Sequence, residues 1–418
     1  MPLPKANSPR RPVVYLDQWV WIRLALAAAG RPRAAVDVEA LHAILEASAA
    51  GVAFPLSATH YEETLRITDP RQRSDLASVM AVVSQMRTLR RQTDLVRHQF
   101  LVALHETVGR PTFRPKEIDP LGIGANWAFR GVHAFMRVLD PDGRVVTSVD
   151  PVWLRSVNQY AEAMLLAGPA DEDLPALRED GYREPRELES AENSRLAWEQ
   201  LLDEQLLEYP GVSRAELRVW LLARELSHEY LDLLNGLFNE YRLSLWAISP
   251  TADGVTSRKR VVSFVERVPT LRIAAETKLE IFRDKNRTWS WNILRDIDAL
   301  SIAIPYCDVV VADKDAVSLV TRAKAPGRHG SAVVSRLEDL LALLPTLTST
   351  AITVTRDYRG WDQVAPGTGF SLETPSSLAR RDIEAGRVVR MLDEDGTPTL
   401  SRGHNGGLPD RGGIPART

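Results

Sequence analysis

The sequence predicts an α/β fold in which a parallel sheet flanked by helices is interrupted by a large all-α insertion. Short apolar runs alternate with amphipathic stretches near both ends of the chain, the order of strands and helices in a parallel sheet. Between them, residues 71–284 carry apolar side chains at three- and four-residue spacing, which indicates long helices. We therefore expect the two sheet-forming regions to share one core.

The first part of this core is expected in residues 12–70. The apolar run VVYL, ending at Asp17, predicts a short buried strand, and a helix follows over residues 19–29. Residues 36–50 predict a second helix. The run VAFPLS then predicts a second strand, after which Ser57 caps a helix that begins ATHYEETLRI.

The second part of the core is expected in residues 285–345. The order there is a helix (WSWNILRDIDALSIAI), a strand (DVVVAD), a helix (KDAVSLVTRAK), a strand (SAVVS) and a last helix (RLEDLLALLPTL). From about residue 355 the alternation of strand and helix patterns ends, and Gly, Pro and Arg are frequent at the end of the chain. Residues 355–418 are therefore predicted to be a disordered tail.

Composition and the lack of targeting signals predict a cytoplasmic protein. The net charge of −3 argues against a basic coat over the whole surface, and a single cysteine, Cys307, rules out a disulfide framework. The N-terminus lacks the apolar stretch of a signal peptide. The apolar run at 19–30 contains Arg23 and is too short to span a bilayer, so no membrane contact is expected.

Carboxylates follow the predicted strands. Asp17 ends the first strand and Asp313 ends DVVVAD, while Glu62 and Glu63 lie in the helix after the second strand. In an open parallel sheet, the carboxyl ends of the strands meet at one edge. The helix that carries Asp296 and Asp298 comes just before the strand ending at Asp313, so its acids can face the same edge.

Such a group of acids needs a positive partner. Two carboxylates about 4 Å apart repel by on the order of 4 kcal/mol at an effective dielectric constant of 20. Oxygen ligands suit Mg²⁺ or Mn²⁺, so we expect one or two such ions. Alternatively, some of these acids only cap helices, as Asp315 could do.

On these residues the chain resembles the PIN-like domain family, to which many toxin and RNA-processing ribonucleases belong. VVYLD supplies Asp17, FPLSATHYEET the glutamate, DIDALSIAIPYCD the third acid and VVVADKD supplies Asp313. Glu63 fits the family pattern better than Glu62, and Asp298 better than Asp296. One departure is Gln18-Trp19, where the family usually has Thr-Asn.

The resemblance implies a PIN-like nuclease that uses Mg²⁺ or Mn²⁺ to hydrolyse RNA, or less readily DNA, with a toxin or defence role and an inhibitory partner protein consistent with the family. It implies catalytic roles for Asp17, Glu63, Asp298 and Asp313, with Asp296 and Asp315 as further metal ligands. The residues expected to contact the substrate are Ser57, Thr59, Arg283, Lys285 and Arg287. The alternative is a catalytically inactive PIN-like protein that binds RNA or has a regulatory role.

Overall fold

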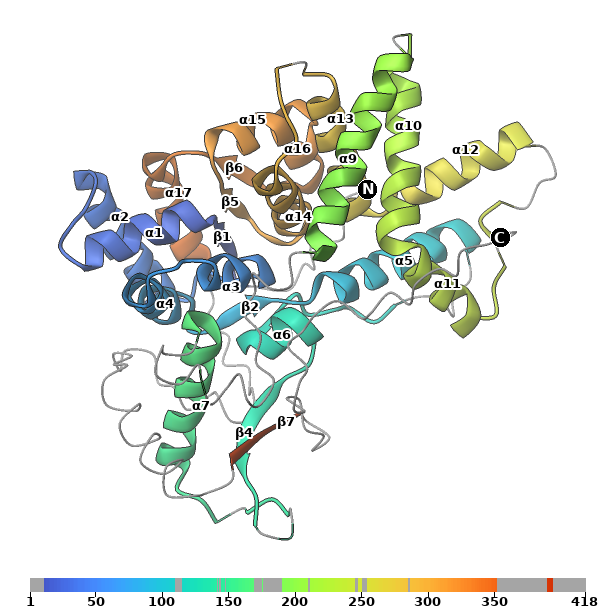
Figure 1. Cartoon of the computed structure of the whole chain (residues 1–418). Helices are drawn as coiled ribbons and strands as arrows, with labels where there is room; N and C mark the ends of the chain where they lie inside the picture. Colours follow the sequence, from blue (N-terminus) through green and yellow to red (C-terminus); the bar gives the residue numbers. More distant parts are fainter. Residues whose placement is uncertain are drawn as a thin grey trace.

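The structure is a computed structural model of the chain. It describes residues 11–109, 115–140, 142, 144–146, 148–168, 175, 190–209, 211–244, 247–249, 254–284, 286–351 and 389–393. The protein is a mixed α/β protein that is mostly helical (Figure 1). Its sheet is small and parallel.

The parallel sheet joins the two ends of the predicted core. Strands β1 (Val14–Leu16), β5 (Val309–Val311) and β6 (Ala332–Val334) pair in the order β1-β5-β6. Leu16 is opposite Val311 in this register, so β1 and β5 end side by side. Regions 12–70 and 285–345 therefore share one sheet, as the sequence predicts.

The predicted second strand forms only single bridges, one beside β1 and one to a separate strand. Ala53 bridges Val13, and Leu56 bridges Thr88 of β2 (Arg87–Leu89), both in parallel. The amide of Leu56 donates to the carbonyl of Arg87 at 2.8 Å. Pro55 lies between the two bridges and has no amide hydrogen to donate, which limits regular pairing here.

Alternate strand residues face two helical layers, as the period of a strand requires. Val14, Leu16, Val309 and Val311 belong to one apolar cluster. The helices that share it include α1 (Gln18–Ala28), α2 (Ala35–Ala49), α4 (Pro70–Ser84) and α17 (Leu337–Thr350). Tyr15 and Val310 face the opposite layer. That layer includes α5 (Gln92–Val108), α13 (Pro269–Phe282), α14 (Trp291–Tyr306) and α15 (Lys314–Arg322).

The region predicted as an all-α insertion also contains strands. The apolar pattern over residues 74–108 predicts continuous helix, but α4 ends at Ser84, and Gln85 and Met86 adopt positive φ angles of 52° and 54°. β2 follows and pairs with β3 (Leu121–Ile123) in an antiparallel ribbon. The all-α prediction is therefore wrong at these strands.

A second ribbon lies apart from the parallel sheet. β4 (Ala134–Val138) pairs antiparallel with β7 (Val389–Asp393), close to α6 (Gly124–Arg130) and α7 (Pro151–Ala167) in Figure 1. The prediction of a disordered tail is wrong for residues 389–393. Apart from these five residues, the tail region 355–418 lies outside the described part of the chain.

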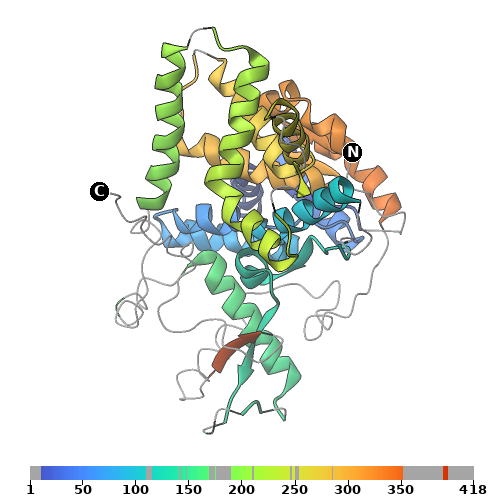
Figure 2. The same cartoon turned by 90° about the vertical axis from the view of Figure 1, so that its right-hand side faces the viewer.

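Most of the remaining helices lie in the upper half of Figure 1, where α10 packs against α13. Helices α9 and α10 rise together from the body of the molecule (Figure 2). Between α10 and α11 the chain forms a π-helical turn, η3 (Glu225–Tyr230). The bounds of the other helices here are Ser190–Glu208 (α9), Arg214–Arg224 (α10), Leu231–Glu240 (α11), Gly254–Val265 (α12) and Ala325–His329 (α16).

Candidate functional site

Two aspartates lie at the carboxyl ends of neighbouring strands. Asp17 follows β1, and its amide donates to the carbonyl of Val311 at the end of β5 at 2.9 Å. Asp313 caps α15, where its Oδ1 accepts from the amides of Asp315 at 2.6 Å and Ala316 at 2.8 Å. Asp17 caps α1 and accepts from the amide of Gln18 at 2.6 Å. Backbone amides thus fix both carboxylates at this edge of the sheet.

Two further carboxylates interact with this pair, and we call Asp17, Glu63, Asp296 and Asp313 the acidic cluster. Burial raises the pKa of Asp17 to about 6, with a further contribution from the charge of Asp313. Burial and the charge of Asp17 raise the pKa of Glu63 to about 7. Burial raises the pKa of Asp296 to about 8, and the charges of the other three members add to this effect. The cluster therefore behaves as one repelling group.

Two arginines near the cluster offset only part of its negative charge. Arg295 lowers the pKa of both Glu63 and Asp296, and Arg66 lowers that of Glu63. The net shifts of both acids are nevertheless upward. These arginines therefore do not neutralise the cluster, and a cation would find a favourable field there.

A buried histidine holds α3 (Ala58–Leu65), the helix of Glu63, against the end of β1. Nε2 of His60 lies 2.8 Å from the carbonyl oxygen of Leu16, and Nδ1 accepts from the amide of Ser57 at 2.9 Å. Nε1 of Trp21 donates to the same Leu16 carbonyl at 2.9 Å. Burial lowers the pKa of His60 to about 4, so the ring is neutral and positions the site rather than acting as a base. Sequence reasoning missed this role, since a lone His in a helix gives no signal.

A cleft of about 250 Å³ opens beside the cluster, and we call it the acidic cleft. It includes Asp296 and Asp313 in its walls, together with Arg287 and, from α13, Thr277. The full lining is Thr277, Arg287, Ile293, Asp296, Ile297, Leu300, Asp313, Asp315, Ala316 and Leu319. Thr277 lies within the predicted insertion, which thus supplies one wall of the site.

The oxygen atoms of the cluster are of the type that binds a hard divalent cation, but their arrangement does not form a metal site. All four members offer carboxylate oxygens, the ligands preferred by Mg²⁺ and Mn²⁺. In the part of the chain that the structure describes, no group of three or more His, Cys, Asp or Glu side chains is arranged to hold a metal ion. Binding would therefore require the carboxylates to rotate toward a common point.

Asp298, expected as the third catalytic acid, has another partner. Its two oxygens accept from Arg195 of α9 at 2.7 and 3.0 Å. Residues two apart on a helix face nearly opposite sides, so only one of Asp296 and Asp298 can point at the cluster. The structure places Asp296 there, which corrects the preference for Asp298.

The other predicted site residues are spread around the cleft. Asp315 lines it, but its side chain is 78% exposed and lies 3.7 Å from Arg287. Ser57 belongs to the His60 network, and Thr59 is half-buried on α3. Arg283 is exposed and outside the cleft lining, and Lys285 lies outside the described residues. Of the predicted cations that the structure describes, Arg287 lines the cleft and Arg283 does not.

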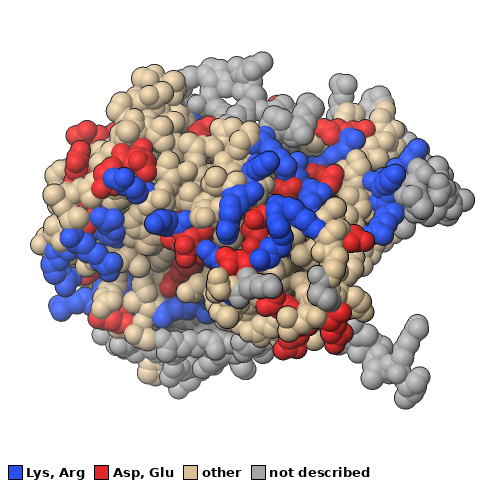
Figure 3. Space-filling model, turned by 90° about the horizontal axis from the view of Figure 1, so that it is seen from above, with Lys and Arg blue, Asp and Glu red and all other residues tan. Residues whose placement is uncertain are grey.

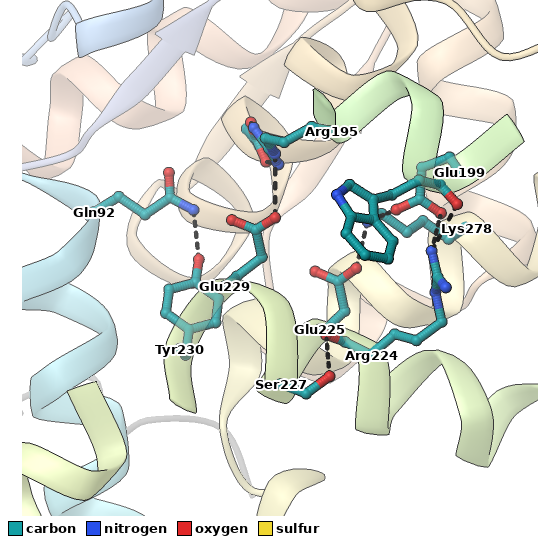
Figure 4. Close-up of polar contacts among 11 residues, drawn as sticks. Gln92, Arg195, Glu199, Arg224, Glu225, Ser227, Glu229, Tyr230 and Lys278 are labelled. Carbon is teal, nitrogen blue, oxygen red and sulfur yellow. Dashed lines mark hydrogen bonds and ion pairs between the residues drawn. The ribbon is translucent and has the colours of Figure 1, made fainter. Parts of the chain in front are cut away.

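A buried ion network lies beyond Asp298, next to η3 (Figure 4). Nζ of Lys278 lies 2.7 Å from Glu199 and also contacts Glu225, and all three are buried. Arg195 joins Glu229 at 3.2 Å as well as Asp298. The network ties α9 and η3 to α13 and α14, and thereby to the helix that carries Asp296.

Comparisons of the chain with protein-family models, with curated proteins and with solved structures found no match. None of the described helices has the length and apolar character needed to cross a membrane.

Proposed function

We propose that this chain is a Mg²⁺- or Mn²⁺-dependent nuclease whose substrate is RNA. The observation that carries the proposal is the acidic cluster: four carboxylates from separate parts of the chain lie at the carboxyl edge of a parallel sheet, and burial together with neighbouring acids raises the pKa of Asp17, Glu63 and Asp296. Strongly perturbed acids beside a cleft are typical of catalytic sites. The choice of RNA rests on the resemblance to PIN-like ribonucleases.

In this proposal the position of each residue determines its role, as a metal ligand or as a contact of the substrate. Asp17 and Asp313, fixed by backbone amides, would be the principal metal ligands, with Glu63 and Asp296 completing the set after losing their protons. A bound divalent ion would supply an activated water and stabilise charge on the phosphodiester. Arg287, in the wall of the cleft, would attract the substrate phosphate.

The second candidate is a catalytically inactive protein of the same fold that binds RNA. Two observations favour it. Gln18-Trp19 stands where the family usually has Thr-Asn, which removes a polar group often near the metal, and Nε2 of Gln18 donates to Oγ1 of Thr64 at 3.2 Å. Among the described residues, no set of three or more His, Cys, Asp or Glu side chains is arranged to hold a metal ion.

Activity assays separate the two candidates. The full chain would be incubated with total RNA, and separately with single- and double-stranded DNA, each with Mg²⁺, Mn²⁺ or EDTA. We expect RNA cleavage that requires the metal and is lost in Asp313→Asn. Asp339→Asn is the matched control, because Asp339 is an exposed acid in the first turn of α17. RNA that stays intact under every condition would refute the nuclease proposal.

A further inference from the structure

A second cleft, of about 210 Å³, lies between α10, α13, α15 and α16. Five of the eight residues that line it are cationic, and we call it the basic cleft. Its lining consists of Arg214, Arg218, Glu276, Leu279, Arg322, Ala323, Lys324 and Arg328. No local motif marks this group, because its cations come from two distant stretches of the sequence, residues 214–218 and 322–328.

Two buried glutamates of α13 hold the arginines in place. Glu276, 7% exposed, accepts from Arg328 at 2.6 and 2.8 Å and from Arg218 at 2.8 Å. Glu280, one helical turn later, lies 2.5 Å from Arg214 and 4.0 Å from Arg322. The four arginines are thus oriented by buried carboxylates while remaining partly exposed, with side-chain exposures between 26% and 50%.

Positive charge remains in excess after these pairings. The arginines of the cleft pair with Glu266, Glu276 and Glu280, so five cations face three carboxylates. Lys324 is exposed and forms no ion pair with any described residue. Basic side chains with carboxylates between them also gather on the face seen in Figure 3. A cleft of this kind attracts anions.

The basic cleft and the acidic cleft lie on one face of the same helix. Leu319 lines the acidic cleft and Ala323 the basic cleft, and residues four apart are neighbours on a helix surface. Asp313 caps one end of α15 and Arg322 ends it, a distance of roughly 14 Å at 1.5 Å per residue. An extended polyanion can therefore contact both clefts at once.

The lining also indicates how such a polyanion would be held. No aromatic side chain lines the basic cleft, so stacking on bases is not available there. Arginines in fixed orientation match phosphate oxygens, which carry no sequence information. The acidic cleft, at about 250 Å³, cannot enclose both strands of a duplex.

We propose that the basic cleft binds the backbone phosphates of a single-stranded RNA that runs along α15 into the acidic cleft. The choice of RNA rests on the proposed nuclease function, whereas the phosphate site rests on the geometry of the cleft itself.

Binding can be measured without cleavage. The probe is a fluorescein-labelled single-stranded RNA of ~12 nucleotides, within the range of single-strand binding sites, and its polarisation is followed in EDTA as salt is varied. The test variant is Arg322→Gln/Lys324→Gln, since both side chains are exposed and glutamine keeps most of their length. The control Arg31→Gln/Arg33→Gln removes equal charge from the exposed turn between α1 and α2.

We expect the test variant to bind RNA about tenfold or more weakly near physiological salt, with the slope of log K against log salt reduced by about 1.4 for two lost contacts. The control and the charge-retaining Arg322→Lys/Lys324→Arg should bind as the unchanged protein does. Equal losses in test and control, no loss in the test variant, or preference for a duplex would each overturn the proposal. RNA binding that needs the basic cleft but leads to no cleavage with Mg²⁺ would uphold this cleft and remove the nuclease function. RNA cleavage with Mg²⁺, together with unaltered RNA binding by the test variant, would uphold the nuclease function and overturn the role of the basic cleft.

Discussion

Asp296→Asn provides the sharpest test of the acidic cluster, because the substitution should stabilise the metal-free protein while abolishing the proposed nuclease activity. Burial and three neighbouring carboxylates raise the pKa of Asp296 to about 8 from an ordinary value of 3.8. As pH rises between these values, the unfolded chain ionises this group and the folded chain does not. Stability is therefore lost as pH rises toward 8, and an amide in the same place avoids that loss.

The size of the effect follows from the shift. A shift of about four pKa units corresponds to at most about 6 kcal/mol. The side chain is partly exposed and the four acids can move apart, so screening reduces the expected gain to about 1–3 kcal/mol above pH 8. For a chain of 418 residues, the corresponding change in melting temperature is roughly 1–4 °C.

The assay is thermal unfolding in EDTA at pH 5 and pH 8.5. Asp298→Asn is a matched control two residues away, since loss of its paired hydrogen bonds with Arg195 should lower the melting temperature at both pH values. If Asp296→Asn melts below the unchanged protein at pH 8.5, or if its effect is the same at both pH values, the cluster is not a repelling group.

Three further predictions concern the surroundings of the site. Saturating Mg²⁺ should raise the melting temperature more at pH 8 than at pH 6, because Glu63 and Asp296 must lose protons with pKa values of about 7 and 8 to become ligands; an equal rise at both would contradict this. Folding depresses the pKa of His60 from 6.5 to about 4, so its contribution of ~3 kcal/mol is present above pH 6.5 and lost toward pH 4. In urea titrations His60→Gln should therefore lose less stability than the unchanged protein over that range. Lys278→Met should lower the free energy of unfolding by about 3–5 kcal/mol, because Glu225 stays buried without its cation and Glu199 keeps only Arg224, at 3.8 Å. Replacing both glutamates by Leu as well should restore most of the loss.

The sequence predicts the sheet and its acidic edge well because both depend on local order. Apolar runs followed by acids identify β1 and β5, and parallel strands bring their carboxyl ends together regardless of the distance along the chain. The run VAFPLS is less regular than predicted because proline removes a donor from the ladder. The break after α4 is hidden because Gln85 and Met86 adopt left-handed backbone conformations without being glycine.

The choice between Asp296 and Asp298 depends on helix phase, which short motifs do not fix. Both acids lie within the same apolar run, and residues two apart lie on nearly opposite sides of a helix. The sequence pattern therefore does not show which of the two faces the cluster. What decides the question is Arg195, which is 103 residues away in sequence from Asp298. Contacts of this range, like the cations of the basic cleft, come from tertiary packing and leave no local pattern.

Helix α13 shows how the region outside the predicted core becomes part of the site. Thr277 lines the acidic cleft, Lys278 anchors the ion network, and Glu276 and Glu280 orient the arginines of the basic cleft. Successive residues of a helix point about 100° apart, so one nearly buried helix can reach all three features at once. A shift of α13 along its axis would move the three together. Substitutions in its core should therefore alter RNA binding and metal affinity in parallel, whereas substitutions at the surface of either cleft should alter only one.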